Sequence, residues 1–241
     1  MKIKNEFIIV YAALFRRGEM LKAQKLQDCI PLDLKNDPDI KKIFEECNTH
    51  LEKLSQAPMK GRELEGWSEQ PIQIFPKFTL ALEKLKKLKD INKILDVGCY
   101  TGAFVKYCSS LGYKCCGVDI FPELMNKLSQ NNPDIRFMFL QAERLFLLKE
   151  QFDLICLFDV LEHCFHYEKV LNGIQHISHK GTHVFVNLPR HTPDYIDEAY
   201  EHVMMWDDEM IKNVFGKYNK FTFELCKDEH GRDTSFITFQ L

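Results

Sequence analysis

The 241-residue sequence has little net charge. Lys and Arg number 32 against 35 Asp and Glu, which gives a formal net charge of −3. A chain of this charge has no general attraction for nucleic acid, so a nucleic-acid partner would need a local basic patch. The basic run at residues 84–89 is typical of a solvated helix face.

The sequence also lacks paired-cysteine motifs and a long hydrophobic run. Its nine cysteines are odd in number and show no Cys-x-x-Cys spacing, which favours free thiols in a reducing, cytoplasmic compartment over a disulfide framework. The apolar run at residues 7–15 is too short to span a membrane. Glu6 opens this run, Arg16 and Arg17 close it, and no small-residue cleavage site follows, so we expect no secretion signal.

Two segments precede the main pattern of the chain. Residues 1–56 read as helices, and the clearest one starts at Asp37 and Pro38, an N-cap followed by proline. The helix–turn–helix order faintly resembles tetratricopeptide repeats, but fewer than three repeats do not fold alone. We therefore expect a helical cap that packs on the main domain, on a second copy of the chain or on another partner. Residues 57–76 are rich in proline and glycine and read as a linker or pocket-mouth loop.

From residue 77 onward, short apolar runs alternate with helical segments. Strands are predicted at 93–97, 113–118, 136–140, 153–158 and 183–188, and helices at 77–89, 103–111, 123–130, 144–149, 167–177 and 207–215. Two strands without a helix between them, at 220–226 and 235–241, form an antiparallel hairpin. The pattern predicts an α/β domain at 77–241. Its sheet is mostly parallel with an antiparallel end, it carries helices on both faces, and ligands bind at the carboxyl ends of its strands.

The turn after the first strand carries the chemistry. It holds Gly98 and Gly102 but lacks the other glycines of a dinucleotide-binding turn. Asp96 would repel a phosphate near 4 Å by about 1 to 4 kcal/mol, whereas it would attract an ammonium group. Asp119 follows at the end of the second strand, where an acid accepts hydrogen bonds from a ribose. A ribose and an amino-acid ammonium without phosphate describe S-adenosylmethionine.

Four segments resemble motifs of one known family. Residues 94–104 resemble motif I of the class I S-adenosylmethionine-dependent methyltransferases, and residues 117–120 resemble their second-strand acid. Residues 141–143 stand at their adenine-side segment. Residues 153–163 resemble the fourth-strand motif of the ubiquinone-biosynthesis branch, also described as methyltransferase types 11 and 23. The resemblance covers residues 75–241 and implies a Rossmann-like sheet of seven strands. Tyr100, in place of a glycine, and Gln141, in place of an aspartate, depart from the family pattern.

By this resemblance, the cofactor site takes residues from all four segments. The expected binding residues are Asp96, Gly98, Cys99, Tyr100, Gly102, Asp119, Ile120, Gln141, Ala142, Glu143, Phe158, Asp159 and Val160. Purely structural roles compete with this assignment: loop capping for Asp96 and Asp119, core packing for Phe158 and Ile120, and a helix-start charge for Glu143.

Methyl transfer needs a base only where the acceptor must lose a proton. His163, just beyond the fourth strand, is the first candidate, and capping of the local turn is the competing role. Arg190, His191 and Tyr195 follow the fifth strand and are candidates for the substrate side. The spacing of His163, Cys164 and His166 matches no standard zinc site, so no metal is expected.

The sequence thus predicts an enzyme that transfers a methyl group from S-adenosylmethionine to an oxygen or nitrogen of a small molecule or sugar. Two alternatives stay open: methylation of a macromolecule such as RNA or protein, and a non-catalytic partner subunit with the same fold. A nicotinamide-dependent dehydrogenase is disfavoured by the missing glycines.

Overall fold

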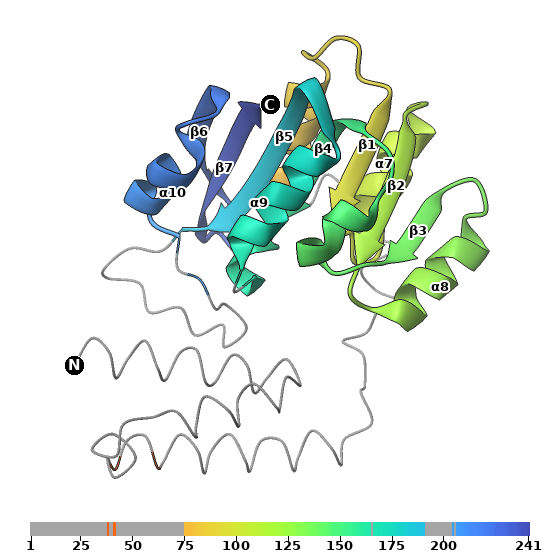
Figure 1. Cartoon of the computed structure of the whole chain (residues 1–241), viewed down its shortest axis with the longest axis horizontal. Helices are drawn as coiled ribbons and strands as arrows, with labels where there is room; N and C mark the ends of the chain where they lie inside the picture. The colour runs from red at the N-terminus through yellow and green to blue at the C-terminus, as the bar shows by residue number, and fades with distance from the viewer. Residues whose placement is uncertain (1–37, 39–40, 42–74, 165, 191–203, 205) are drawn as a thin grey trace. The chain divides into compact units, whose positions relative to one another are not determined.

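The computed structural model describes residues 38, 41, 75–164, 166–190, 204 and 206–241 (Figure 1). The helical cap predicted at residues 1–56 and nearly all of the linker predicted at 57–76 lie outside the described residues. Among the described residues, no helix has both the length and the apolar character needed to cross a lipid bilayer.

The described chain forms a single seven-stranded sheet with helices on both faces. The strands are β1 (Lys93–Val97), β2 (Lys114–Asp119), β3 (Arg136–Phe139), β4 (Phe152–Phe158), β5 (Ser178–Pro189), β6 (Asn219–Lys227) and β7 (Asp233–Gln240). The α-helices are α6 (Pro76–Leu85), α7 (Ala103–Ser110), α8 (Pro122–Asn131), α9 (Tyr167–His176) and α10 (Asp208–Phe215). Two 3-10 helices, η2 (Ala142–Leu147) and η3 (Leu161–His163), flank β4.

The strand order is β3-β2-β1-β4-β5-β7-β6. β1 pairs in parallel with β2 and β4, and the pairs β2–β3 and β4–β5 are parallel as well. β7 runs antiparallel to both β5 and β6, so it closes the C-terminal hairpin. This topology confirms the predicted fold class, a Rossmann-like α/β domain with a mostly parallel sheet and an antiparallel C-terminal hairpin.

The helices bury their apolar side chains against both faces of the sheet. On one face, η2, α9 and α10 pack on a large cluster that includes Val170, Ile174 and Phe215. On the other face, α6 and α7 pack on an aromatic cluster that includes Phe104 and Phe236. Figure 1 shows α9 in front of the sheet. The strands buried on both faces read as continuous apolar runs, which is why the sequence revealed them.

The predicted boundaries of α6, β5 and η2 differ from the structure by two or more residues. α6 ends at Leu85 and not at residue 89, because residues 86–92 form the connection into β1. Within this connection, Asp90 has a non-helical φ of 61°. β5 begins at Ser178 and not at residue 183. Its first residues are polar, and Ser178 pairs with Phe152. The register with β4 then shifts around Gly181, which has a φ of 101°. The helix predicted at 144–149 is the 3-10 helix η2, which lies two residues earlier.

Candidate functional site

The turn between β1 and α7 forms one wall of the site. Gly98 and Gly102 adopt left-handed conformations with φ of 73° and 68°. The N–H groups of Gly98 and Cys99 donate to the carbonyl of Val118 at 2.8 and 3.0 Å, which ties the turn to β2. A Cβ atom on Gly98 would lie 2.5 Å from Cγ2 of Val160, so the turn needs glycine for its space as well as for its φ.

Asp119, the last residue of β2, forms a second wall of the candidate site. Its carboxylate accepts hydrogen bonds from the N–H groups of Tyr100 at 2.8 Å and Ile120 at 2.7 Å. Burial raises the pKa of Asp119, and backbone N–H groups oppose that shift. Tyr100 fills the place of the family's glycine by taking the left-handed φ of 44°, and its ring lies 6.3 Å from the Phe121 ring, edge to face.

Asp96 stands one residue before the end of β1 and is buried. Burial raises its pKa well above the ordinary value, repulsion from Asp119 adds to the shift, and the Lys77 ammonium opposes it. Two buried carboxylates within interaction range favour a cationic ligand and oppose a phosphate.

Lys77, in the first turn of α6, is a residue that sequence reasoning missed. Its ammonium forms a hydrogen-bonded ion pair with Asp159, which follows β4 in a left-handed conformation with a φ of 56°. Burial lowers the pKa of Lys77, but the Asp159 charge and hydrogen bond, helped by Glu229 and Glu162, leave it raised overall. The two partners are 82 residues apart, and no local pattern links them.

The remaining predicted cofactor residues fall into two groups. Some lie in the core: the Phe158 ring packs 5.0 Å from Phe104 and 5.2 Å from Phe78, and the Cys99 thiol lies 3.8 Å from the sulfur of Met125. The others follow β2 and β3 at the same edge of the sheet: Ile120 and Gln141 are exposed, Glu143 is half-buried and Ala142 is buried.

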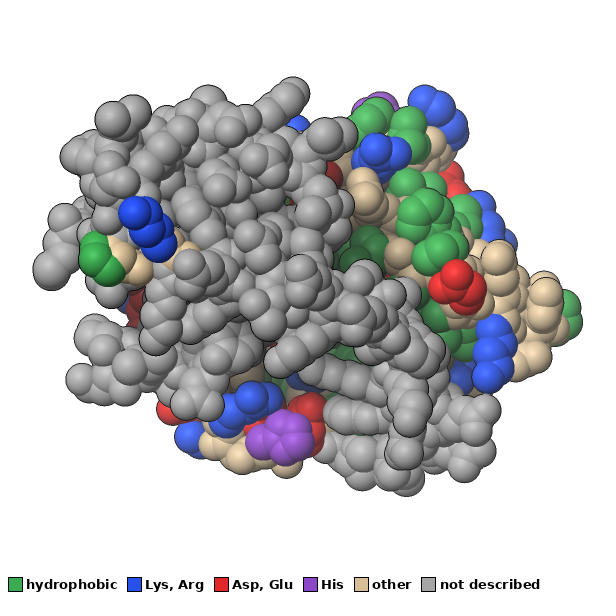
Figure 2. All heavy atoms as spheres, turned by 90° about the horizontal axis from the view of Figure 1, so that it is seen from below, with side chains coloured by type: hydrophobic (Ala, Val, Ile, Leu, Met, Phe, Trp, Pro, Cys, Tyr) green, Lys and Arg blue, Asp and Glu red, His purple; other side chains and the backbone are tan. Residues whose placement is uncertain are grey.

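Figure 2 looks onto the end of the domain that lies below in Figure 1, and hydrophobic side chains gather on its described part. Exposed apolar residues that follow or end β2 and β3 are Ile120, Phe121 and Phe139. An apolar surface beside Asp119 suits a flat heteroaromatic base.

The residues expected on the acceptor side are only partly described. His163 ends η3 and is half-buried, and its N–H donates to the Val160 carbonyl at 3.0 Å. Arg190 forms a two-pronged ion pair with Asp208, at 2.9 and 3.0 Å. His191 and Tyr195 lie outside the described residues. No group of three His, Cys, Asp or Glu side chains suited to a metal is found among the residues that the structure describes.

Comparisons with known proteins agree with this geometry. Residues 46–226 match the model of a family described as a methyltransferase domain. An uncharacterised methyltransferase of Schizosaccharomyces pombe is 30% identical over 115 residues, which is 44% of this chain and 75% of the yeast protein.

Among solved structures, the N-methyltransferase NodS from Bradyrhizobium japonicum WM9 in complex with S-adenosyl-l-homocysteine superposes with a TM-score of 0.56. The match has 18% identity and covers 76% of this chain and 93% of that one. TehB from Haemophilus influenzae matches with a TM-score of 0.55 and 15% identity, over 66% of this chain and 61% of TehB. The chain therefore spans less than two thirds of TehB. At these identities the structural matches show a shared fold.

The fold and the family match define a class I, Rossmann-like methyltransferase. The chain belongs to the methyltransferase-domain family, whose model covers more than half of its length. It is an S-adenosylmethionine-dependent methyltransferase.

Proposed function

We propose that the protein methylates an oxygen or nitrogen atom of a small molecule or sugar. The observation that carries this proposal is the charge at the carboxyl ends of β1, β2 and β4, where three carboxylates stand: Asp96, Asp119 and Asp159. The Lys77 ammonium acts on two of them, Asp96 and Asp159. Such a site gives no attraction to a polyanionic acceptor such as RNA. The N-methyltransferase NodS shares the fold, and its activity supports a nitrogen acceptor.

The cofactor residues fit S-adenosylmethionine by their chemistry. We assign the ribose hydroxyls to Asp119, whose carboxylate two backbone N–H groups hold in place. The amino group goes to Asp96, and the carboxylate of the methionine part goes to Lys77, the cation that acts on Asp96. Ile120 and Ala142 flank the adenine. When bound, the cofactor supplies a methyl group attached to a positively charged sulfur.

The protein's own contribution is then orientation and, for a hydroxyl acceptor, removal of a proton. Correct positioning of two reacting groups is worth about 7 to 11 kcal/mol. We assign proton removal to His163, which ends the 3-10 helix that follows β4. For a hydroxyl acceptor, His163→Gln should lower kcat by about 100-fold or more and remove the acidic limb of the pH profile. An amine that binds as the free base needs no such group, and the variant would then keep its kcat.

The deciding experiment measures transfer of a tritiated methyl group to fractions of small metabolites, sugars, RNA and protein. Calorimetry with S-adenosylhomocysteine is run in parallel, with Asp119→Ala as the test variant and Asp134→Ala, an exposed acid before β3, as its control. In calorimetry, we expect Asp119→Ala to lose S-adenosylhomocysteine binding and Asp134→Ala to keep it. In the transfer assay, we expect the unmodified chain to label the small-molecule fraction. Label in RNA or protein would refute the acceptor class, and no cofactor binding at all would refute these site assignments.

A further inference from the structure

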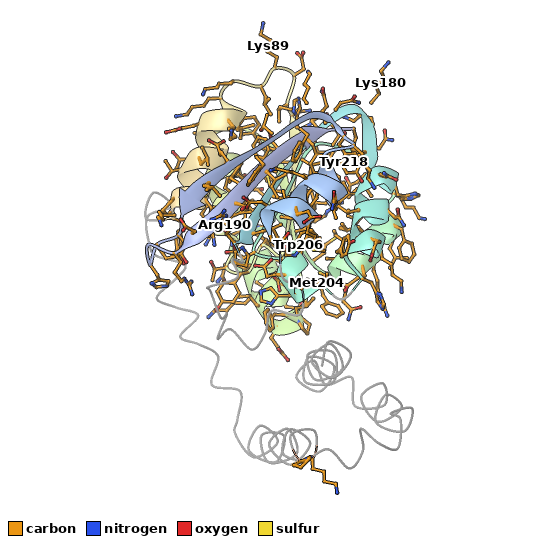
Figure 3. All side chains as sticks on the ribbon, turned by 90° about the vertical axis from the view of Figure 1, so that its left-hand side faces the viewer. Lys89, Lys180, Arg190, Met204, Trp206 and Tyr218 are labelled. Carbon is orange, nitrogen blue, oxygen red and sulfur yellow. The ribbon has the colours of Figure 1, made fainter. Side chains whose placement is uncertain are left out.

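Lysines gather at the edge of the sheet where the parallel strands begin. β6 also begins there, because β5 and β6 both run antiparallel to β7. Exposed lysines stand in the connections into these strands or at the strand starts: Lys86, Lys87, Lys89, Lys114, Lys149, Lys180, Lys217 and Lys220. We call this group the lysine edge. Figure 3 shows Lys89 and Lys180 projecting from the same end of the domain, its upper end in that view.

The acidic residues of this edge are fewer than its lysines. Asp90 and Asp134 are exposed in the connections into β1 and β3, and Glu150 and Asp153 have partners. Glu150 pairs with both Lys93 and Arg136. Asp153 accepts from His179 at 2.8 Å and from two backbone N–H groups at 2.9 and 2.7 Å. In the part of the chain that the structure describes, none of the eight lysines of the lysine edge has an ion-pair partner. The lysine edge is therefore basic although the whole chain is slightly acidic.

One part of this edge is hollowed. A groove of about 390 Å³ runs between the end of α9 and the starts of β5 and β6. Side chains that line it include Gln175, His179, Lys180, Lys217, Tyr218 and Asn219. The Tyr218 ring stacks 4.5 Å from the Phe239 ring, so it is held firmly, and the Lys217 ammonium lies 5.4 Å from the Tyr218 ring centre.

We propose that the lysine edge and its groove bind the backbone of a single-stranded nucleic acid. Exposed ammonium groups bind phosphates through charge, and a fixed aromatic ring with neighbouring amides gives bases a surface to contact. A lipid surface would call for exposed apolar anchors at the binding site. Leu111 and Leu147 are exposed in the connections into β2 and β4, but the groove itself is lined mainly by polar and charged residues.

This binding surface is separate from the methyl-transfer site. Asp96 and Asp119 stand at the carboxyl ends of their strands, whereas the lysine edge borders the amino ends. Along the five residues of β1 the two lie on the order of 15 Å apart. The bound strand is thus a docking partner and not the acceptor at that site, and the proposal stands or falls independently of the acceptor class.

The test is fluorescence anisotropy of the full chain with a short fluorescein-labelled oligouridylate, without cofactor. If Lys180, Lys217 and Lys220 each neutralise one phosphate, the slope of log affinity against log salt is about −2.1, so raising KCl from about 50 to about 200 mM weakens binding about 20-fold. The double variant Lys180→Glu/Lys217→Glu should lose at least about tenfold in affinity and flatten that slope.

The control is Lys127→Glu/Lys169→Glu, which makes the same charge change on exposed residues of α8 and α9. We expect it to bind nearly as the unmodified chain does. A milder pair, Lys180→Gln/Lys217→Gln, covers the case in which the charge-reversed protein does not fold. Equal losses in test and control, no binding at the lowest salt, or binding of phosphatidylserine vesicles or polyglutamate in preference to oligouridylate would each overturn the proposal.

Discussion

Gly98→Ala is the sharpest test of how the cofactor turn is built. The φ of 73° would strain an alanine by about 1 to 2 kcal/mol. The new Cβ, 2.5 Å from Cγ2 of Val160, adds an overpacking cost of about 1 to 3 kcal/mol. The total of about 2 to 5 kcal/mol should lower the thermal midpoint by roughly 4 to 20 °C. Calorimetry should show that binding of S-adenosylhomocysteine is also lost, because the turn must shift.

Gly112→Ala is the matched control, because Gly112 has a φ of 94° but nothing within 4 Å of the added atom. It carries the backbone strain alone, and its midpoint should fall by only about 2 to 8 °C. Val160→Ala removes the clashing atom and leaves its Cβ at an ordinary 3.7 Å. In that background, Gly98→Ala should cost no more than Gly112→Ala does. Equal costs of Gly98→Ala with and without Val160→Ala would refute the steric reasoning.

Three further predictions concern charge. Burial raises the pKa of Asp96, so its neutral form stabilises the fold and that contribution is lost as pH rises through the raised pKa. Asp96→Asn, which cannot ionise, should therefore melt at a higher temperature than the unmodified chain at neutral pH. Calorimetry should show about 10- to 100-fold weaker S-adenosylhomocysteine binding, since a charged partner is lost. A double-mutant cycle of Lys77→Met with Asp159→Asn, followed by denaturant unfolding, should give a coupling of about 0.5 to 1 kcal/mol, because the pair is partly exposed; no coupling would contradict the ion pair. Hydrogen bonds to the Lys180 carbonyl and to Asp153 raise the pKa of His179 above 6.5, and Asp153 is lowered below 3.8. The stability that this pair adds should be present between about pH 4 and 6.5, and it should fade as pH rises through the pKa of His179. In His179→Gln, the melting temperature should no longer fall over that pH range.

The sheet could be predicted because its central strands carry their signal locally. β1 and β4 are runs of apolar residues buried on both faces, and such runs read as strands without any tertiary information. The start of β5 could not be found this way. Residues 178–182 are polar and are broken by Gly181, and they join the sheet only because Phe152 lies opposite Ser178.

The same distinction holds for the site. Asp96, Gly98 and Asp119 could be proposed from the sequence because each stands at a fixed position relative to a strand and a turn. Lys77 was missed because its partner, Asp159, is 82 residues away and meets it only through the packing of α6. The departure of Tyr100 from the family pattern is visible in the sequence, but only the structure shows its φ and the hydrogen bond that its N–H donates to Asp119.

The direction of the parallel strands has an electrical consequence. Because β1, β2, β4 and β5 all point the same way, the carboxylates that follow strands collect at one end of the sheet and the lysines that precede strands collect at the other. The described domain therefore carries a charge dipole whose negative end is the proposed cofactor site. S-adenosylmethionine carries one more positive charge than its demethylated product, so this dipole should speed the arrival of the donor more than that of the product. Added salt should screen this kinetic advantage away, even though both molecules occupy the same pocket.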